Sequence, residues 1–225
     1  RSSSFWPRSS DHFDHFGKHQ SGIYMPQGPE FIRCDYPNPL PVHTDLAFAL
    51  DPALLMQQCG LSPGPWQADL LYANAQRTLL LCCRQSGKST VTAVLALHEA
   101  LYHPPALVLL LSPSSRQSQE LFRKIVSQYR AFQHPMPSGQ ESALRLELTN
   151  GSRIISLPSK EETIRGFSGV RLLVIDEAAR VPDELYFAVR PMLAVSGGHL
   201  VALSTPWGRR GWFYDAWIGT MRGSG

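Results

Sequence analysis

The 225-residue sequence has few cysteines, no long hydrophobic run and little excess charge. Its four cysteines form no CxxC pair and no Cys/His cluster with zinc-ligand spacing, so we expect reduced thiols rather than a metal framework. The longest apolar run, Ala106–Leu111, is much shorter than the roughly 20 residues that cross a bilayer, and no signal peptide is evident. We therefore expect a protein that is not secreted and has no membrane partner.

The net charge of +3 is only weakly basic. It permits a nucleic-acid partner without indicating one, because a local basic patch is sufficient for binding. Residues 1–45 are rich in Ser, His, Gly and Pro and lack helical or strand periodicity, which predicts a flexible or loosely docked N-terminal segment. His12, His15 and His19 have a spacing compatible with metal ligands, but such a segment would not hold them rigidly.

Beyond this segment the chain alternates strand-like and helix-like stretches. Helical patterns cover residues 88–102 and 115–132, and Asn150-Gly151 between two alternating runs predicts a β-hairpin. Continuous apolar runs predict buried strands at residues 78–83, 106–112, 170–176 and 199–205. Strands that are apolar on both faces and separated by helices predict an α/β fold, with a mainly parallel sheet covered by helices on both faces. We expect this domain to span residues 46–218.

A candidate phosphate-binding loop follows the first predicted strand and opens a predicted helix, which is the context that such a loop requires. Its residues are Arg84, Gln85, Ser86, Gly87, Lys88, Ser89 and Thr90. Lys88 would contact the β- and γ-phosphates of ATP, and the Ser89 hydroxyl would bind Mg²⁺. Cys82 occupies the position of the usual first glycine in GxxxxGK[ST], so the match is incomplete. A chance GKS sequence at a helix start is the alternative interpretation.

An acidic pair, Asp176-Glu177, follows the strand predicted at residues 170–176. Ligands of open α/β sheets bind at the carboxyl ends of the strands. We expect Asp176 to hold Mg²⁺ and Glu177 to act as the general base that polarises the attacking water. Such a pair is typical of the RecA-like (ASCE) branch of P-loop NTPases. The alternative is a strand end that caps the following helix.

Two features around the phosphate loop resemble phage terminase large subunits, in particular their N-terminal ATPase domain. Trp66-Gln67 looks like the glutamine motif of helicases and terminases, in which an amide pairs with adenine. Arg84-Gln85 resembles the start of the RQxGKS form of the loop that is common in that family. On this resemblance, Trp66 and Gln67 join the loop as nucleotide-binding residues.

Two features after the acidic pair extend the resemblance, which covers roughly residues 65–217. LSTPWG at residues 203–208 is similar to the family's coupling motif, carried here by Ser204 and Thr205. GWFYDAW at residues 211–217 looks like the aromatic stretch that ends the family's ATPase domain.

The resemblance implies a Mg²⁺-dependent ATPase that drives double-stranded DNA into a procapsid. Such a motor works as a ring on a portal protein, with a small terminase subunit, in the cytoplasm of the infected host. Residues 219–225 would be the start of a linker to the family's nuclease domain. Because that domain would lie beyond this sequence, we expect no nuclease activity from this chain.

A ring ATPase usually needs an arginine that reaches the γ-phosphate, in cis or from a neighbour. Arg165, which lies in a glycine-containing segment before the acidic strand, is the first candidate and is expected to act across subunits. Arg84 could act in cis, and Arg116 and Arg145 are further candidates. A solvated surface arginine is an equally compatible interpretation for each.

Two other functions compete with the motor. A superfamily-2-type helicase, or another DNA-dependent ATPase, shares the glutamine motif, the phosphate loop and the acidic pair. It needs a second RecA-like domain, however, for which this sequence has no room. An inactive, truncated remnant that only binds packaging partners is the alternative of another class. Against it, Lys88, Ser89, Asp176 and Glu177 are all present.

Overall fold

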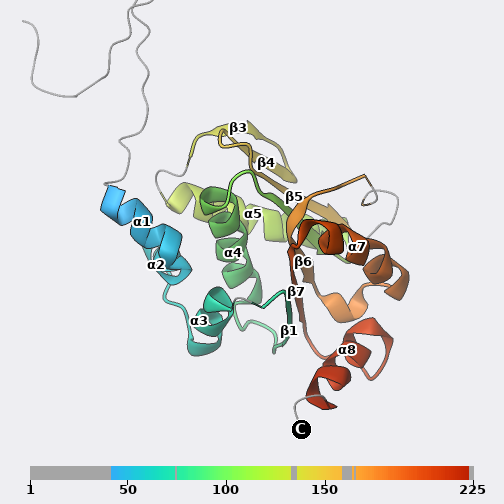
Figure 1. Cartoon of the computed structure of the whole chain (residues 1–225). Coiled ribbons are helices and arrows are strands. Elements are labelled where there is room, and N and C mark those ends of the chain that lie inside the picture. The colour runs from blue at the N-terminus through green and yellow to red at the C-terminus, as the bar shows by residue number, and fades with distance from the viewer. Residues whose placement is uncertain (1–41, 74, 133–135, 159–163, 165, 223–225) are drawn as a thin grey trace, which may run out of the picture. The chain divides into compact units, whose positions relative to one another are not determined.

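Seven strands form one sheet in the order β1-β7-β6-β2-β5-β4-β3, with helices on both sides (Figure 1). The computed structural model describes residues 42–222 apart from 74, 133–135, 159–163 and 165. The strands are β1 (Arg77–Leu81), β2 (Leu107–Ser112), β3 (Ser138–Glu141), β4 (Arg145–Leu148), β5 (Arg153–Pro158), β6 (Val170–Asp176) and β7 (His199–Ser204). The helices are α1 (Val42–Leu50), α2 (Pro52–Gln58), α3 (Pro65–Tyr72), α4 (Lys88–Tyr102), α5 (Ser115–Ala131), the 3₁₀ helix η1 (Ala178–Arg180), α7 (Asp183–Ser196) and α8 (Gly211–Arg222).

Five strands of the sheet pair parallel with one another, and β4 and β3 are added through antiparallel pairs. The parallel pairs are β1 with β7, β7 with β6, β6 with β2, and β2 with β5. β4 pairs antiparallel with β5, and β3 pairs antiparallel with β4. The predicted α/β fold with a mainly parallel sheet is therefore confirmed.

The hairpin predicted at Asn150-Gly151 joins β4 to β5. Gly151 has a φ of 84°, a left-handed conformation that glycine adopts without steric cost. The Asn150 side chain accepts from the Ser152 N–H at 2.9 Å and donates to the Ala100 carbonyl, also at 2.9 Å. These bonds fix the turn and join it to the end of α4.

The central strands are apolar on both faces because each face covers a separate core. α4 and α5 lie on one face, and α7 and α8 lie on the other (Figure 1). On β2, Val108 and Leu110 belong to the first core, whereas Leu107, Leu109 and Leu111 belong to the second. Period-2 alternation thus divides one apolar run between two helical layers.

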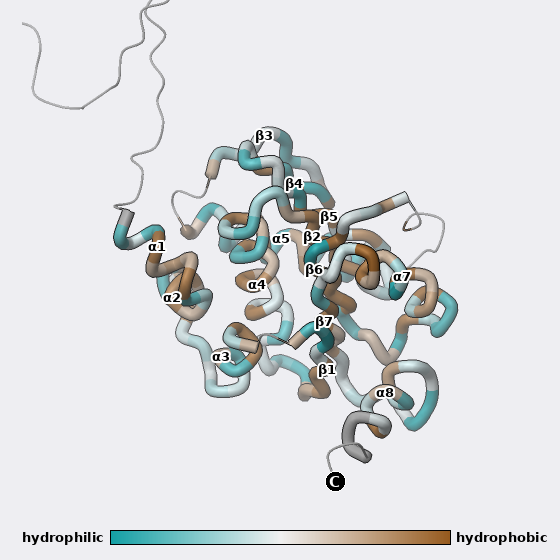
Figure 2. The backbone as a smooth tube through the Cα atoms, viewed as in Figure 1, coloured by the Kyte–Doolittle hydropathy of each residue, from teal (hydrophilic) through white to brown (hydrophobic). Residues whose placement is uncertain are grey.

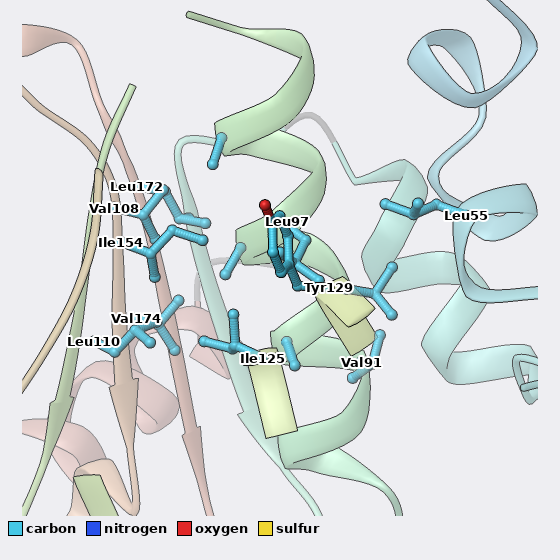
Figure 3. Close-up of a cluster of buried hydrophobic side chains, with 14 of the residues drawn as sticks. Leu55, Val91, Leu97, Val108, Leu110, Ile125, Tyr129, Ile154, Leu172 and Val174 are labelled. Carbon is cyan, nitrogen blue, oxygen red and sulfur yellow. The ribbon is translucent and has the colours of Figure 1, made fainter. Parts of the chain in front are cut away.

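The first core is the interface between the sheet and the helices α4 and α5. Figure 3 shows Ile154 of β5 and Leu172 and Val174 of β6 facing Leu97 of α4 and Ile125 of α5. Each of these side chains is at most 3% exposed. Fully burying such a side chain contributes about 1.5–3 kcal/mol, so this interface holds α4 firmly against the sheet.

The helices α4 and α5 agree with the predictions for residues 88–102 and 115–132. In Figure 2, α4 is mostly pale or brown, whereas α5 alternates between teal and brown. The difference reflects their positions, because α4 contacts both α5 and the helices α2 and α3, while α5 has an exposed side. Ser114 caps α5 by accepting from the Gln117 N–H at 3.4 Å.

The prediction of a buried strand at residues 78–83 is wrong in both extent and burial. β1 ends at Leu81, which is 38% exposed, and Cys83 is exposed in the loop that follows. The physical reason is that β1 is a terminal strand of the sheet and pairs only with β7. An apolar run in a sequence does not distinguish such a strand from a central one.

The N-terminal segment predicted at residues 1–45 lies mostly outside the described residues, as do His12, His15 and His19. Its last part begins α1 at Val42, and at the other end α8 continues to Arg222. The boundaries at residues 45 and 218 stay predictions. None of the helices in the described parts of the chain has both the length and the apolar character needed to cross a membrane.

A buried histidine connects α1 to α4. The His98 Nε2 atom lies 3.1 Å from the Phe48 carbonyl oxygen and 3.2 Å from that of Ala49. Because carbonyl oxygens only accept, this nitrogen carries the proton. Burial lowers the pKa of His98 below its usual value, and repulsion by the nearby His103 lowers it further.

Candidate nucleotide-binding site

Three loops meet at one edge of the sheet, because the parallel strands β1, β7 and β6 are neighbours and end on the same side. The phosphate loop follows β1, the Ser204-Thr205 segment ends β7, and the acidic pair ends β6. β7 lies between the other two strands. It therefore brings Thr205 beside Glu177, which also lies near Lys88 although the three are far apart in the sequence.

The phosphate loop runs from Cys82 to the first turn of α4. Gly87 immediately precedes α4 with a φ of 86°, so glycine suits this position. Gln85 also has a positive φ, 61°. The φ of Cys82 is not positive, so this position accommodates a side chain in place of the usual first glycine. The Lys88 Nζ atom donates to the Cys83 carbonyl at 3.2 Å, folded back against its own loop.

The acidic pair has a strained backbone and a buried carboxylate. Glu177 adopts a left-handed conformation, with φ 48° and ψ 44°, which is uncommon for a residue with a side chain. Asp176 is 8% exposed and accepts the Glu177 N–H at 3.0 Å. Burial, and secondarily repulsion by Glu177, raises the pKa of Asp176 to about 6.

The donor set at this edge fits Mg²⁺. Among the described residues, Asp176 takes part in no ion pair within 4.0 Å, so its buried charge lacks a close counter-charge. Mg²⁺ prefers carboxylate and hydroxyl oxygens and is usually bound by one or two carboxylates plus phosphate. Ser89, half-buried in the first turn of α4, can supply the hydroxyl.

Thr205 holds the Glu177 carboxylate. Its Oγ1 donates to Glu177 Oε2 at 2.9 Å, and its backbone N–H approaches the same oxygen at 3.5 Å. The other oxygen, Oε1, lies 4.0 Å from the Lys88 Nζ atom. Ser204 secures the neighbouring turn, since its Oγ accepts the Ala179 N–H at 3.2 Å and its carbonyl accepts the Cys82 N–H at 3.0 Å. One carboxylate oxygen is therefore anchored, and the other faces the lysine of the phosphate loop.

Gln67 contacts the phosphate loop with its side-chain amide. Its Oε1 accepts the Gly64 N–H at 2.8 Å, and its Nε2 donates to the Ser86 carbonyl at 3.4 Å. An amide oxygen has a second lone pair and an amide nitrogen a second hydrogen, so both remain able to pair with a base. Trp66, by contrast, is partly buried and packs against the first core.

The candidate catalytic arginines that the structure describes lie on three separate elements. Arg165 lies outside the described residues. Arg84, in the phosphate loop, and Arg116, in the first turn of α5, are both exposed. Arg145 pairs with Glu147 on β4, which agrees with a role as a strand-face charge.

Sequence reasoning found both motifs but did not foresee the hydrogen bond from Thr205 to Glu177. That contact depends on β7 inserting between β1 and β6, which the order of the motifs along the chain does not reveal. The resemblance marked Ser204 and Thr205 without saying which group they contact.

The fold and this arrangement of loops define the class as P-loop NTPase. A model of the family described as "Terminase large subunit, T4likevirus-type, N-terminal" matches residues 79–225. The chain belongs to this family.

Individual relatives agree with this membership. The terminase large subunit of Thermus phage G20c is 27% identical over 183 residues, which cover 73% of this chain. The match covers only 38% of that protein's length. Among solved structures, the large terminase ATPase domain of Thermus phage P74-26 superimposes with a TM-score of 0.64 at 23% identity, covering 71% of each chain.

The large terminase of bacteriophage HK97 has a TM-score of 0.63 at 18% identity, covering 78% of this chain and 41% of that one. At such identities these structures share the fold. The matches do not favour the helicase or the inactive remnant.

Proposed function

We propose that this domain hydrolyses ATP with Mg²⁺ and that this hydrolysis drives double-stranded DNA into a viral procapsid. The observation that carries the proposal is the convergence of Lys88, Thr205 and Glu177 at one sheet edge, in a chain of the terminase family. The names of the relatives, which include an ATPase domain of a large terminase, support the same activity.

The geometry supports a division of roles in hydrolysis. The backbone N–H groups of the phosphate loop would bind the phosphates, and Lys88 would exchange the Cys83 carbonyl for the β- and γ-phosphates. Ser89 and Asp176 would hold Mg²⁺, which supplies neutralisation of phosphate charge. Thr205 would fix Oε2 of Glu177, so that Oε1 is directed toward the phosphate site.

Glu177 would then accept a proton from water. The water oxygen attacks the γ-phosphorus, and the bond between this phosphorus and the β,γ-bridging oxygen breaks, which leaves ADP and inorganic phosphate. Arg165 is proposed to reach the nucleotide of a neighbouring subunit in a ring, and Arg84 that of its own. The portal protein, the small terminase subunit and the host cytoplasm as the site of action are likewise proposed from family membership.

The test is phosphate release by the wild type and by two variants. Lys88→Ala should abolish ATP affinity or turnover, because the lysine serves the ligand rather than the core. Glu177→Gln should keep ATP and Mg²⁺ bound but reduce turnover by roughly 100-fold or more, because the general base is lost.

Asp176→Asn provides the comparison, since it should weaken binding of Mg²⁺ and nucleotide. Turnover in Lys88→Ala equal to that of the wild type would contradict the assignment of the site. If the Asp176 and Glu177 variants both lost metal and nucleotide, the division of roles would be wrong.

A further inference from the structure

A basic and aromatic surface lies beside the candidate site, on the two segments that follow β6 and β7. Trp207, two residues after Thr205, is 46% exposed. The Arg180 guanidinium, on η1, lies 4.1 Å from the centre of the Trp207 ring. Arg209 and Arg210 follow on the same exposed segment. We call Arg180, Trp207, Arg209 and Arg210 the Trp207 surface.

Within the described part of the chain, the positive charge of this surface is only partly balanced by carboxylates. Among the described residues, no ion pair joins Arg180, Arg209 or Arg210 to a carboxylate. Arg180 and Arg210 line a hollow of about 250 Å³. Asp183 also lines it, with its Oδ1 accepting the Trp212 N–H at 2.8 Å, and its single negative charge offsets only part of the positive charge of the three arginines. Two exposed guanidinium groups, those of Arg209 and Arg210, and the half-buried one of Arg180 favour a ligand with several negative charges.

The chemistry favours a nucleic-acid backbone over a single phosphate. The positive groups are distributed over two separate segments, η1 and the loop before α8, rather than enclosed around one point. Guanidinium groups pair with phosphate oxygens in a planar, often bidentate geometry, and a run of such groups matches consecutive phosphates. The Arg180 guanidinium lies over the Trp207 ring, and nearly half of the Trp207 side chain remains exposed.

The Trp207 surface is joined to the catalytic glutamate through short covalent and hydrogen-bonded connections. Only Pro206 separates Trp207 from Thr205, whose hydroxyl holds Glu177. On the other segment, Arg180 ends the 3₁₀ turn that begins immediately after Glu177. The backbone N–H of Arg180 donates to the backbone carbonyl of Glu177 at 2.9 Å. A ligand that moved either segment would therefore move Glu177 or its anchor.

We propose that the Trp207 surface binds the phosphate backbone of double-stranded DNA and transmits that contact to Glu177 through Thr205. The inference rests on the proposed function, since it names where the DNA meets the ATPase site. DNA binding at this place stimulates hydrolysis because one of the two segments holds the Glu177 carboxylate through Thr205 and the other is continuous with the Glu177 backbone.

The experiment compares the wild type with the double variant Arg209→Ala/Arg210→Ala. Binding to a short fluorescein-labelled duplex is measured by anisotropy over a range of salt concentrations, and ATP hydrolysis is measured with and without the duplex. The matched control is Arg123→Ala/Arg130→Ala on α5, where both arginines are exposed, pair with Glu120 and Glu141, and give the same loss of positive charge. Thermal melting of each variant verifies that the fold is retained.

Each phosphate contact contributes about 0.9 to the slope of log affinity against log salt. The Arg209/Arg210 variant should therefore lower the magnitude of this slope by about 2 and raise the Kd by roughly 60-fold at about 0.1 M salt. Its hydrolysis should lose the stimulation by DNA. The control should keep wild-type affinity, slope and stimulation.

Three results would overturn the inference: an unchanged Kd in the Arg209/Arg210 variant, a rise equal to that in the control, or no DNA binding by the wild type. Failure of the proposed function has a different signature, namely wild-type hydrolysis that is absent or insensitive to Lys88→Ala. Hydrolysis that depends on Lys88, together with an unchanged Kd for DNA in the Arg209/Arg210 variant, would refute this inference alone.

Discussion

Replacing Thr205 by valine removes one hydroxyl and nearly nothing else. Thr205 is 6% exposed, and valine, which carries a methyl group in place of the hydroxyl, has almost the same shape, so the packing around it should be retained. The lost interaction is the 2.9 Å hydrogen bond from Oγ1 to the Glu177 carboxylate. What remains is the Thr205 backbone N–H at 3.5 Å, which is at the limit of a hydrogen bond.

A hydrogen bond to a charged group contributes about 1.5–3 kcal/mol. If this bond orients Glu177 in the transition state, its loss lowers turnover by roughly 10- to 150-fold, because about 1.4 kcal/mol corresponds to a factor of ten. The KM for ATP should change little, since Thr205 serves the carboxylate rather than the phosphates. A loss confined to kcat would identify an interaction that matters in the transition state.

The assay is steady-state phosphate release over a range of ATP concentrations, combined with direct titration of nucleotide binding. Thr205→Ser is the control, because serine keeps the hydroxyl and should retain most of the turnover. Wild-type turnover in Thr205→Val would refute the reasoning. So would Thr205→Ser as slow as Thr205→Val, which would make the methyl group, and hence packing, the important part.

Three further outcomes are expected. Gln67→Ala should weaken the binding of ATP more than that of GTP, by roughly 5- to 150-fold in relative Kd from competition titrations, since a bidentate amide–adenine pair is worth roughly 1–3 kcal/mol. An unchanged ratio would leave Gln67 only as a support of the phosphate loop. Gly198→Ala should lower the free energy of unfolding in urea by about 3 kcal/mol or more, because its new Cβ would lie 2.1 Å from the Val170 carbonyl oxygen. Gly219→Ala is the control and should not lower it, since a Cβ there would have no neighbour within 4 Å. The free energy of unfolding should fall as the pH falls below about 6.5, by at most about 1.4 kcal/mol per pH unit, because His98 is neutral in the fold but binds a proton in the unfolded chain. His98→Gln should remove this part of the pH dependence, and an unchanged dependence would assign it to other groups.

Most of the element positions could be predicted from the sequence, because the central elements have strong and consistent patterns. α4 has the predicted bounds, and β2, β6 and β7 differ from the predictions by no more than a residue at either end. The burial of β1 could not be predicted, since an apolar run carries no information about whether a strand lies at the edge of its sheet. Only the pairing with neighbouring strands, which is non-local, decides this.

The candidate site shows the same limit. Lys88 and the Asp176-Glu177 pair were predicted because their motifs are local and adjoin recognisable strands. The contact between Gln67 and Ser86 was not predicted, because nothing in the sequence places α3 over the phosphate loop. The hydrogen bond from Thr205 to Glu177 was likewise not predicted, because it depends on strand order.

The central position of β7 has a consequence for biosynthesis. Of the described strands, β7 is the last to be synthesised, yet it lies between β1 and β6, and Ser204 hydrogen-bonds to the loops that follow both of those strands. A nascent chain that contains the phosphate loop and the acidic pair but not residues 199–205 cannot yet hold them together. Because the connecting contacts are long-range in sequence, closing the site is a late step of folding. The domain therefore assembles its candidate nucleotide site only after β7 has been synthesised.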